Sequence, residues 1–586
     1  MTTDNESYYL GIDVGTGSAR ASLLSPTGTL IASSTVSTKT WRDPSDHRIF
    51  EQSTDDIWAA IVSAVKTCLE GKSPSAVKGL GFDATCSLAV CDLEGKPLTV
   101  TRGDALGTPG ERNIILWADH RAEKEADLIN STQSLVLDYV GGTMSLEMEI
   151  PKILWLKSHL PPAIFSTCQF FDLPDFLTYR ATNDATRSSC SLTCKCSYVP
   201  THSGWQDDFF EKIGLGELVQ SGYRAVGAGR AAGPGMGVLT AGQPVGKGLS
   251  KRAAEELGLV EGTPVGSGVI DAYAGWLGTV AARFNEDGKL SDIVPSLEES
   301  QHRLAAVAGT STCHLVQSPQ GVFVNGVWGP YRDPVFRGWW MNEGGQSSTG
   351  QLIDFMLTTH PAYAELQERA KSEDKNMFVL LHDLMEHLRT SENASSFTEV
   401  LKDMHMYPDF HGNRSPLADP RMRGALTGLT LSSSLSALAL TYHLTLESIA
   451  LQTRHILESL NAAGHKITSI YMSGGQATNR VLMQLFADVC GVPVVLPFEH
   501  SGAVGRGAAV LGRFAAEVVK AGEGMGEREQ DELLWKIMVE MTPAGTLVAP
   551  SATPKVKKLL EAKYKIFRET IEIQKRWRKE MEEASK

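Results

Sequence analysis

The sequence predicts an α/β protein with two domains. Short apolar runs typical of strands alternate with stretches of helical spacing along 586 residues, a length that favours more than one domain. Two strand pairs, each joined by a turn rich in Gly, Thr and Ser, open at residues 8–24 and 304–317, one in each half. This repeated opening suggests an internal duplication. We place the domains at 1–272 and 273–550, followed by a basic tail at 551–586.

The first half begins with antiparallel strands and continues with helices. Its strands are rich in apolar and β-branched residues, and its first helix has Asp55 and Asp56 near the start, where acids favour the helix dipole. We expect strands at 8–13, 19–24, 30–38 and 77–82 and a helix at 54–69.

The second half repeats this order and ends in a basic tail. We expect strands at 304–308, 313–317 and 467–472 and helices at 432–460 and 481–490. The polar, acidic stretch from Asn285 to Arg303 is expected to be a surface loop. The tail permits an amphipathic helix, and packing on the acidic body is favoured over a membrane or partner contact.

Composition limits the classes of partner. A net charge of −13 argues against a protein dominated by nucleic-acid or anionic-membrane contacts. The nine cysteines lack metal-ligand spacing, which favours reduced thiols, and we do not expect the polar N-terminus to act as a signal peptide. The apolar stretch 265–282 contains an Asp and several glycines, so a buried strand and helix are expected rather than a membrane span. We expect a cytoplasmic protein without nucleic-acid or membrane partners; a homodimer stays open.

Asp271 is the most informative single residue. It ends a Gly-rich apolar run that begins at Thr263, and a small-residue segment that can start a helix follows it. A strand can carry such an acid to its C-terminal end, where α/β proteins place their chemistry. Asp is also a preferred helix N-cap, and in isolation the cap is the simpler interpretation. The loops described next favour chemistry.

The turn Asp13–Arg20 is built for phosphate. Its glycines let backbone N–H groups approach phosphate oxygens, Thr16 and Ser18 add donors, and Arg20 adds charge. Asp13 can hold Mg²⁺ through water. Two weaker turns of the same kind follow at 309–312 and 473–479. Each alone could be an ordinary turn, but three in one chain indicate a nucleotide.

Together these segments resemble the FGGY carbohydrate kinases over residues 8–545. The resemblance rests on segments that occur in the family's order: Gly11–Arg20, Leu116–Ala122, Gly268–Ala272, Ala308–Ser311 and Ser473–Gln476. It implies two RNase H-like domains of the actin, sugar kinase and Hsp70 type, with the active site in the cleft between them. It also implies phosphorylation of sugars or polyols with ATP and Mg²⁺.

The resemblance then implies roles for single residues. Asp271 falls on the general base, which would take the proton of the attacking sugar hydroxyl. Gly17 stands where many relatives have a hydroxyl residue, so its contact would be through the backbone. The positions implied to bind ATP are Gly15, Thr16, Gly17, Ser18, Arg20, Gly309, Thr310, Gly350, Asp354, Gly475 and Asn479.

Within the family, Gly81–Leu88 resembles the D-ribulokinase branch, which implies conversion of D-ribulose to D-ribulose 5-phosphate. Without the resemblance, Lys195 would be an ordinary exposed lysine and 85–87 a buried turn. His411 and Arg414 could contact substrate or phosphate, or only brace their loop. The positions implied to bind the ketose are Thr85, Cys86, Ser87, Trp117, Asp119, Lys195 and Glu343.

Three alternatives remain open at this point. L-ribulokinase or xylulokinase activity would use the same machinery. An actin- or Hsp70-like nucleotide switch would use the same fold and loops, with a partner interaction as its output. A sugar sensor without catalysis is disfavoured by the presence of Asp271 and both loops.

Overall fold

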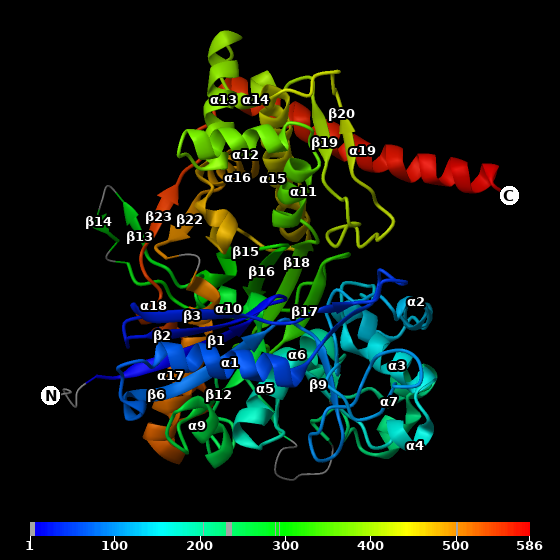
Figure 1. Ribbon diagram of the computed structural model, residues 1–586, viewed down its shortest axis with the longest axis vertical. Helices are drawn as coiled ribbons and strands as arrows, with labels where there is room; N and C mark the ends of the chain where they lie inside the picture. Colours follow the sequence, from blue (N-terminus) through cyan, green and yellow to red (C-terminus); the bar gives the residue numbers. More distant parts are fainter. Residues whose placement is uncertain (1–5, 203, 230–236, 287–288, 292, 500–501) are drawn as a thin grey trace.

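The computed structural model describes residues 6–202, 204–229, 237–286, 289–291, 293–499 and 502–586. It consists of two α/β halves, with the first half in blue and cyan below the second half in green to orange (Figure 1). Within the described residues, no helix combines the length and the apolar character that crossing a bilayer requires.

The core of the first half is a five-stranded sheet in the order β12-β6-β1-β2-β3. Strands β1, β2 and β3 are antiparallel, whereas β1, β6 and β12 are parallel. The predicted strands and helix are confirmed, with α1 ending at Cys68. The bounds are β1 Tyr8–Val14, β2 Ser18–Leu24, β3 Leu30–Ser37, α1 Thr54–Cys68, β6 Val77–Ala84 and β12 Val265–Ile270.

The second half repeats this topology inside a sheet of nine strands. Its inner order, β22-β21-β15-β16-β18, has the same parallel and antiparallel pairings as the first sheet, which agrees with the predicted duplication. The bounds of the nine strands are β13 Phe284–Glu286, β14 Lys289–Leu290, β15 Arg303–Ala308, β16 Thr312–Ser318, β17 Trp328–Arg332, β18 Trp340–Gln346, β21 Ser469–Ser473, β22 Val494–Pro497 and β23 Gly545–Val548.

Smaller sheets and helices complete both halves. A second sheet and helices α2 to α9 extend the first half, and helices α11 to α16 cover the second. The second sheet has the order β4-β5-β8-β7-β9, with bounds β4 Trp41–Arg42, β5 Phe50–Gln52, β7 Leu88–Cys91, β8 Ile114–Ile115 and β9 Gln169–Asp172. The helices away from the site are α2 Glu123–Ser131, α4 Pro162–Phe165, α5 Leu173–Thr182, α7 Asp207–Lys212, α8 Gly216–Gln220, α9 Lys251–Leu257, α12 Tyr363–Ser372, α13 Met377–Ser391 and α14 Phe397–Val400. Those that bear on the site are α3 Glu149–His159, α6 Ser189–Lys195, α10 Asp271–Leu277, α11 Gly350–Thr358, α15 Leu435–Ala463 and α16 Arg480–Cys490. The helices predicted at 432–460 and 481–490 are therefore confirmed as α15 and α16.

The prediction of a loop from Asn285 to Arg303 is partly wrong. Strand β13 pairs with β23 at the sheet edge, and residues 298–302 form a short 3₁₀ helix. Backbone pairing with the edge of a sheet satisfies groups that a free loop would leave to water. Asp287, Gly288 and Asp292 of this stretch lie outside the described residues.

Near its end the chain returns to the first half. Helix α17 (Ala503–Ala521), drawn in orange in Figure 1, packs against the first sheet, with α18 (Glu527–Met541) beside it. The contact is backbone against backbone: a Cβ at Gly11 would lie 1.8 Å from the Gly505 oxygen, and one at Gly81 2.2 Å from the Ala508 oxygen. The predicted domain boundary at 272/273 assigns α17 and α18 to the second domain, although α17 packs on the sheet of the first half.

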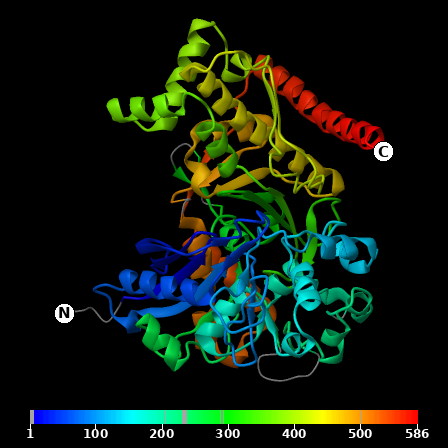
Figure 2. The ribbon, with the colours of Figure 1, turned by 45° about the vertical axis from the view of Figure 1, so that its right-hand side comes forward.

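The predicted tail helix is confirmed as α19 (Pro554–Ala584), which extends away from the body in Figures 1 and 2. Its first part packs on the second half, where Leu560, Phe567 and Ile571 are buried. Lys563 is also buried and forms an ion pair of 3.0 Å with Glu447. This part therefore packs on the body, as expected, whereas Trp577, further along the helix, is exposed.

We expect Gly81→Ala to lower the free energy of unfolding by about 1–3 kcal/mol, because α17 must move away from the sheet to admit a methyl group. Urea denaturation would measure the change. Gly216→Ala is the matched control, since a Cβ there has the Glu211 Cγ as its nearest neighbour at 3.9 Å. Equal stability of the two variants would show that α17 does not press on the sheet.

Candidate active site between the halves

Three carboxylates meet at one edge of the first sheet. Asp13 on β1 lies opposite Asp83 on β6, and Ile270, opposite Ala84, directly precedes Asp271. The three strands are parallel, so their carboxyl ends lie side by side. The register of the sheet therefore brings together Asp83 and Asp271, which are 188 positions apart in the sequence.

The environment of these carboxylates favours their neutral forms. Asp83 is fully buried. No N–H or hydroxyl group among the described residues donates to its oxygens, and its hydrogen-bonding neighbour is the carboxyl of Asp13. Burial raises the pKa of Asp83 well above the usual value, and the charges of Asp13 and Asp271 raise it further. Burial also raises the pKa of Asp13, against the opposing charge of Arg20. An added cation at this edge would relieve the repulsion.

Asp271 is the first residue of α10 rather than its N-cap, which is Ile270. Its Oδ1 accepts a hydrogen bond of 2.7 Å from the Ala272 N–H. Burial raises the pKa of Asp271 to about 7, with a further contribution from the charge of Asp13. A carboxyl that ionises near neutral pH is suited to take and release a proton.

The first Gly/Thr turn is fastened to the segment that carries Trp117. The Gly15 N–H donates to the Ser18 oxygen at 3.0 Å and closes the turn. The Gln52 side chain donates to the Thr16 backbone oxygen at 2.8 Å, and the Trp117 indole N–H donates to the Thr16 hydroxyl at 2.9 Å. A predicted phosphate-binding residue and a predicted sugar-binding residue are therefore in direct contact.

The second Gly/Thr turn meets two other predicted ATP segments. Gln476 donates to the Gly309 oxygen at 2.7 Å, and the Thr349 N–H donates to the Thr310 oxygen at 3.0 Å. A Cβ at Gly350 would lie 2.5 Å from the Gly309 oxygen, so α11 can start here only with glycine. The turn at 309–310, the start of α11 and the segment after β21 thus converge, as the resemblance implies.

The remaining residues predicted to bind ATP differ in how many contacts they make with other protein groups. Asp354 lies exposed on α11, and Gly475 starts a 3₁₀ turn with open space where its side chain would be. The Asn479 side chain caps α16 by accepting from the Leu482 N–H at 3.2 Å and donates to the Tyr442 hydroxyl at 2.8 Å. A contact of Asn479 with the nucleotide stays a prediction.

The segment on which the predicted sugar preference rests follows β6 in the chain and is buried. Thr85, Cys86 and Ser87 all have little exposed surface. The Thr85 and Ser87 hydroxyls lie 3.3 Å apart, and the Ser87 hydroxyl accepts from the Trp117 backbone N–H at 3.2 Å. The segment is thus coupled to Trp117 by a hydrogen bond.

Lys195 and Glu343 come together from opposite halves. Lys195 ends α6 and is buried, contrary to the ordinary expectation for a lysine, and Glu343 lies on β18. The Lys195 ammonium lies 3.5 Å from a Glu343 carboxylate oxygen and 4.2 Å from the centre of the Trp328 ring. Both residues contribute to the electrostatic environment of Asp271.

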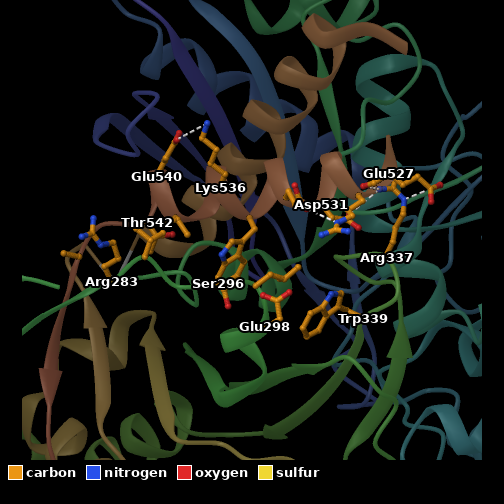
Figure 3. Close-up of a pocket in the computed structure, with 17 residues that line it drawn as sticks. Arg283, Ser296, Glu298, Arg337, Trp339, Glu527, Asp531, Lys536, Glu540 and Thr542 are labelled. Atoms are coloured by element: carbon orange, nitrogen blue, oxygen red, sulfur yellow. Dashed lines mark hydrogen bonds and ion pairs between the residues drawn. The ribbon is translucent and has the colours of Figure 1, made fainter. Parts of the chain in front are cut away.

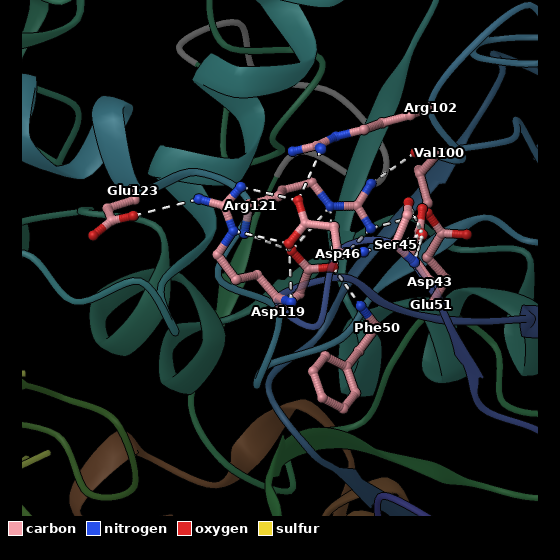
Figure 4. Close-up of polar contacts among 11 residues, drawn as sticks. Asp43, Ser45, Asp46, Phe50, Glu51, Val100, Arg102, Asp119, Arg121 and Glu123 are labelled. Carbon is pink, nitrogen blue, oxygen red and sulfur yellow. Dashed lines mark hydrogen bonds and ion pairs between the residues drawn. The ribbon is translucent and has the colours of Figure 1, made fainter. Parts of the chain in front are cut away.

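Asp119 differs from the other predicted sugar residues, because protein groups occupy both of its oxygens (Figure 4). Its Oδ2 accepts from the Phe50 N–H at 2.7 Å and from Arg121 at 2.7 Å, and its Oδ1 accepts from Arg121 at 2.9 Å. Arg121 also pairs with Glu51 at 2.9 Å, and all three charged side chains are fully buried. Asp119 therefore supports the segment that carries Trp117, and a contact of Asp119 with the sugar stays a prediction.

The sequence alone did not identify Asp83 and Lys152 as residues of the candidate site. Lys152 on α3 is fully buried, and its ammonium has no hydrogen-bond acceptor among the described residues. Burial raises the pKa of the nearby Cys86 thiol well above its usual value, and the charge of Lys152 opposes that rise. The available signal was a lysine within the apolar helical run Ile150–Leu156.

A cavity of about 1130 Å³ lies elsewhere, between α18 and the turn before β18 (Figure 3). Trp339, Trp535 and Asp531 line it, and Arg337 forms an ion pair of 3.3 Å with Asp531 beside it. None of the predicted site residues contributes to its lining. The candidate site therefore rests on its residues and their geometry, not on this cavity.

The carboxylate edge fits a magnesium ion that is bound mainly by other ligands. In the part of the chain that the structure describes, no three His, Cys, Asp or Glu residues are arranged to hold a metal by themselves. Mg²⁺ commonly uses one or two carboxylates and completes its shell with water and phosphate oxygens. Asp13 and Asp83 meet this requirement, since no N–H or hydroxyl group among the described residues donates to the Asp83 oxygens.

Comparisons with known proteins agree with the resemblance. The N-terminal and C-terminal domains of the FGGY family of carbohydrate kinases match residues 8–217 and 304–516. The chain is 44% identical to D-ribulokinase from Saccharomyces cerevisiae, over 87% of this chain and 72% of that protein. It is 42% identical to an FGGY carbohydrate kinase domain-containing protein from Xenopus laevis, over 98% of each chain.

A solved structure supports the fold. The xylulose kinase from Brucella ovis superposes with a TM-score of 0.71, covering 97% of this chain and 100% of that one at 19% identity. The two-domain actin and sugar kinase fold implied by the resemblance is thereby confirmed.

We expect Asp271→Asn to stabilise the ligand-free protein more at pH 8 than at pH 5. The folded state raises the pKa of this carboxyl from 3.8 to about 7, so its ionisation destabilises the fold increasingly between about pH 4 and 7. The difference in the gain should be about 1–3 kcal/mol, measured by urea denaturation at both pH values. An equal gain at the two pH values would contradict the raised pKa.

Proposed function

This chain belongs to the FGGY family of carbohydrate kinases, and we propose that it transfers the γ-phosphoryl group of ATP to D-ribulose, giving D-ribulose 5-phosphate. One observation carries the proposal: Asp271, with its pKa raised to about 7, lies within electrostatic reach of the pair that Lys195 and Glu343 form across the two halves. A potential base and a potential sugar-binding pair are therefore parts of one site.

Asp271 is the proposed general base. It would take the proton of the ketose C5 hydroxyl while the bond from that oxygen to the γ-phosphorus forms and the bond to the β-phosphate oxygen breaks, releasing ADP. At neutral pH a base with a pKa near 7 is ionised in a substantial fraction of molecules and still binds a proton well.

The two Gly/Thr turns are the proposed phosphate cradle. Backbone N–H groups at 15–18 and 309–310 would donate to the phosphate oxygens, and Arg20 would add positive charge where negative charge develops. Asp13, with Asp83 beside it, would hold Mg²⁺, which supplies further positive charge to the phosphates when bound. Because the turns belong to different halves, closure of the halves would exclude water from the transfer.

The choice of D-ribulose rests on the segment Thr85–Ser87 and on the relative named D-ribulokinase. Thr85 and Ser87 offer hydroxyl groups, Lys195 offers an ammonium and Glu343 a carboxylate, so donors and acceptors for several ketose hydroxyls lie close together. A site of this kind discriminates sugars by leaving its buried polar groups unpaired when a hydroxyl is missing or misplaced.

With ATP and Mg²⁺, the purified protein is expected to phosphorylate D-ribulose with a kcat/KM at least about tenfold above those for L-ribulose, D-xylulose and glycerol. A coupled assay for ADP across this panel would measure the preference. A higher kcat/KM for another sugar would overturn the substrate assignment while leaving the kinase activity intact.

Asp271→Asn is expected to lower kcat by about 10²–10⁴-fold and to leave ATP affinity close to that of the original protein. Its amide cannot accept the proton, whereas the phosphate cradle is unchanged. Single-turnover kinetics and ATP titration would separate the two effects. Turnover near the original rate would remove Asp271 from the role of base.

A further inference from the structure

Arg414 lies in a loop that other residues brace. In the loop between β19 (His405–Tyr407) and β20 (Ala425–Thr427), the Asn413 side chain donates to Asp409 at 2.7 Å and accepts from the Leu417 N–H at 2.9 Å. Asp409 is in turn bound by Gln452 on α15 at 2.5 Å. The loop is thus held by its own side chains and by α15, and the Arg414 side chain makes its contacts outside the loop.

Those contacts lead to the proposed sugar pair. The Arg414 guanidinium donates to Glu343 at 2.7 Å and lies 4.0 Å from the centre of the Trp328 ring. Its side chain is only 7% exposed. A Cβ at Gly345 would lie 2.6 Å from the Arg414 Cδ, so the neighbouring strand position needs glycine to leave this arginine its place.

Glu343 is therefore held by two cations. Arg414 binds Oε1, and Lys195 lies 3.5 Å from Oε2, while both cations also contact the Trp328 ring. A charge-assisted bond at each oxygen fixes the orientation of a carboxylate, and the aromatic ring limits where the cations can move. Such fixation reduces the entropy lost when a ligand binds.

Arg414 also faces the first half. Its Nη2 lies 3.8 Å from an oxygen of Glu147, which precedes α3. Arg414, Trp328 and Glu343 all belong to the second half, so separation of the halves would break the contacts with Glu147 and Lys195 and preserve the one between Arg414 and Glu343. Glu343 is therefore in contact with both Arg414 and Lys195 only when the two halves are together.

We propose that Arg414 is a positioning residue for the ketose, which orients Glu343 for the sugar and pairs with Glu147 across the closed cleft. This inference rests on the proposed function of the same site. It gives Arg414 a role in sugar binding that acts through Glu343, without direct contact with the phosphates of ATP.

The test compares Arg414→Met, Arg414→Lys and Arg421→Met with the original protein, using the sugar that the original protein phosphorylates best. Arg414→Met should raise the KM for the sugar about 10–100-fold and leave the KM for ATP unchanged, because a charge-assisted bond to Glu343 is lost. Arg414→Lys should recover part of this loss. Arg421, in the same loop, pairs with exposed Glu582 and serves as the control without effect.

A double-mutant cycle with Glu343→Gln tests whether Arg414 acts through Glu343. If it does, Arg414→Met should add less than about twofold to the loss caused by Glu343→Gln. Independent, multiplicative losses would overturn the inference, as would an unchanged KM for the sugar in folded Arg414→Met protein. A failure of the proposed function would look different, because the original protein itself would then phosphorylate no ketose.

Discussion

The site is arranged around one constraint, the repulsion among three carboxylates that are buried at the same edge of the first sheet. Asp13, Asp83 and Asp271 lie at the carboxyl ends of neighbouring parallel strands. Burial raises the pKa of each carboxyl, and the charges of neighbouring carboxylates raise those of Asp83 and Asp271 further. Such clustering costs stability and persists only where the surrounding fold determines it. The raised pKa suits Asp271 to proton transfer, and the cluster of carboxylate oxygens suits a cation. The clustering that lowers stability is therefore also the basis of the proposed chemistry.

The surrounding fold meets this constraint by rigid packing behind the sheet. Helix α17 lies so close to the first sheet that glycines on both sides replace side-chain contacts, and it also contacts α10: a Cβ at Gly507 would lie 1.9 Å from the Ala274 oxygen. Interiors packed to this density do not deform gradually. The strand that ends at Asp271 and the helix that begins there are thus supported by one element.

Much of this arrangement could be predicted from the sequence, and the limits have physical reasons. Apolar periodicity and Gly/Thr turns predicted the first strands of both sheets, because these features are local. The return of α17 to the first sheet could not be predicted. In the sequence, Gly81 only weakens the prediction of a strand, and nothing local shows that a helix packs against it. The engagement of Asp119 by Arg121 and the pairing of Arg414 with Glu343 likewise depend on neighbours brought together by the fold.

The late position of α17 in the chain has a consequence for synthesis. The five strands of the first sheet are complete at residue 270, but the helix that covers one face of it ends at residue 521. At a typical 5–20 residues per second, about 10–50 s of translation separate these two points. During that interval the nascent first half exposes an apolar sheet face on the ribosome, which makes it a natural client for chaperones that shield unfinished domains.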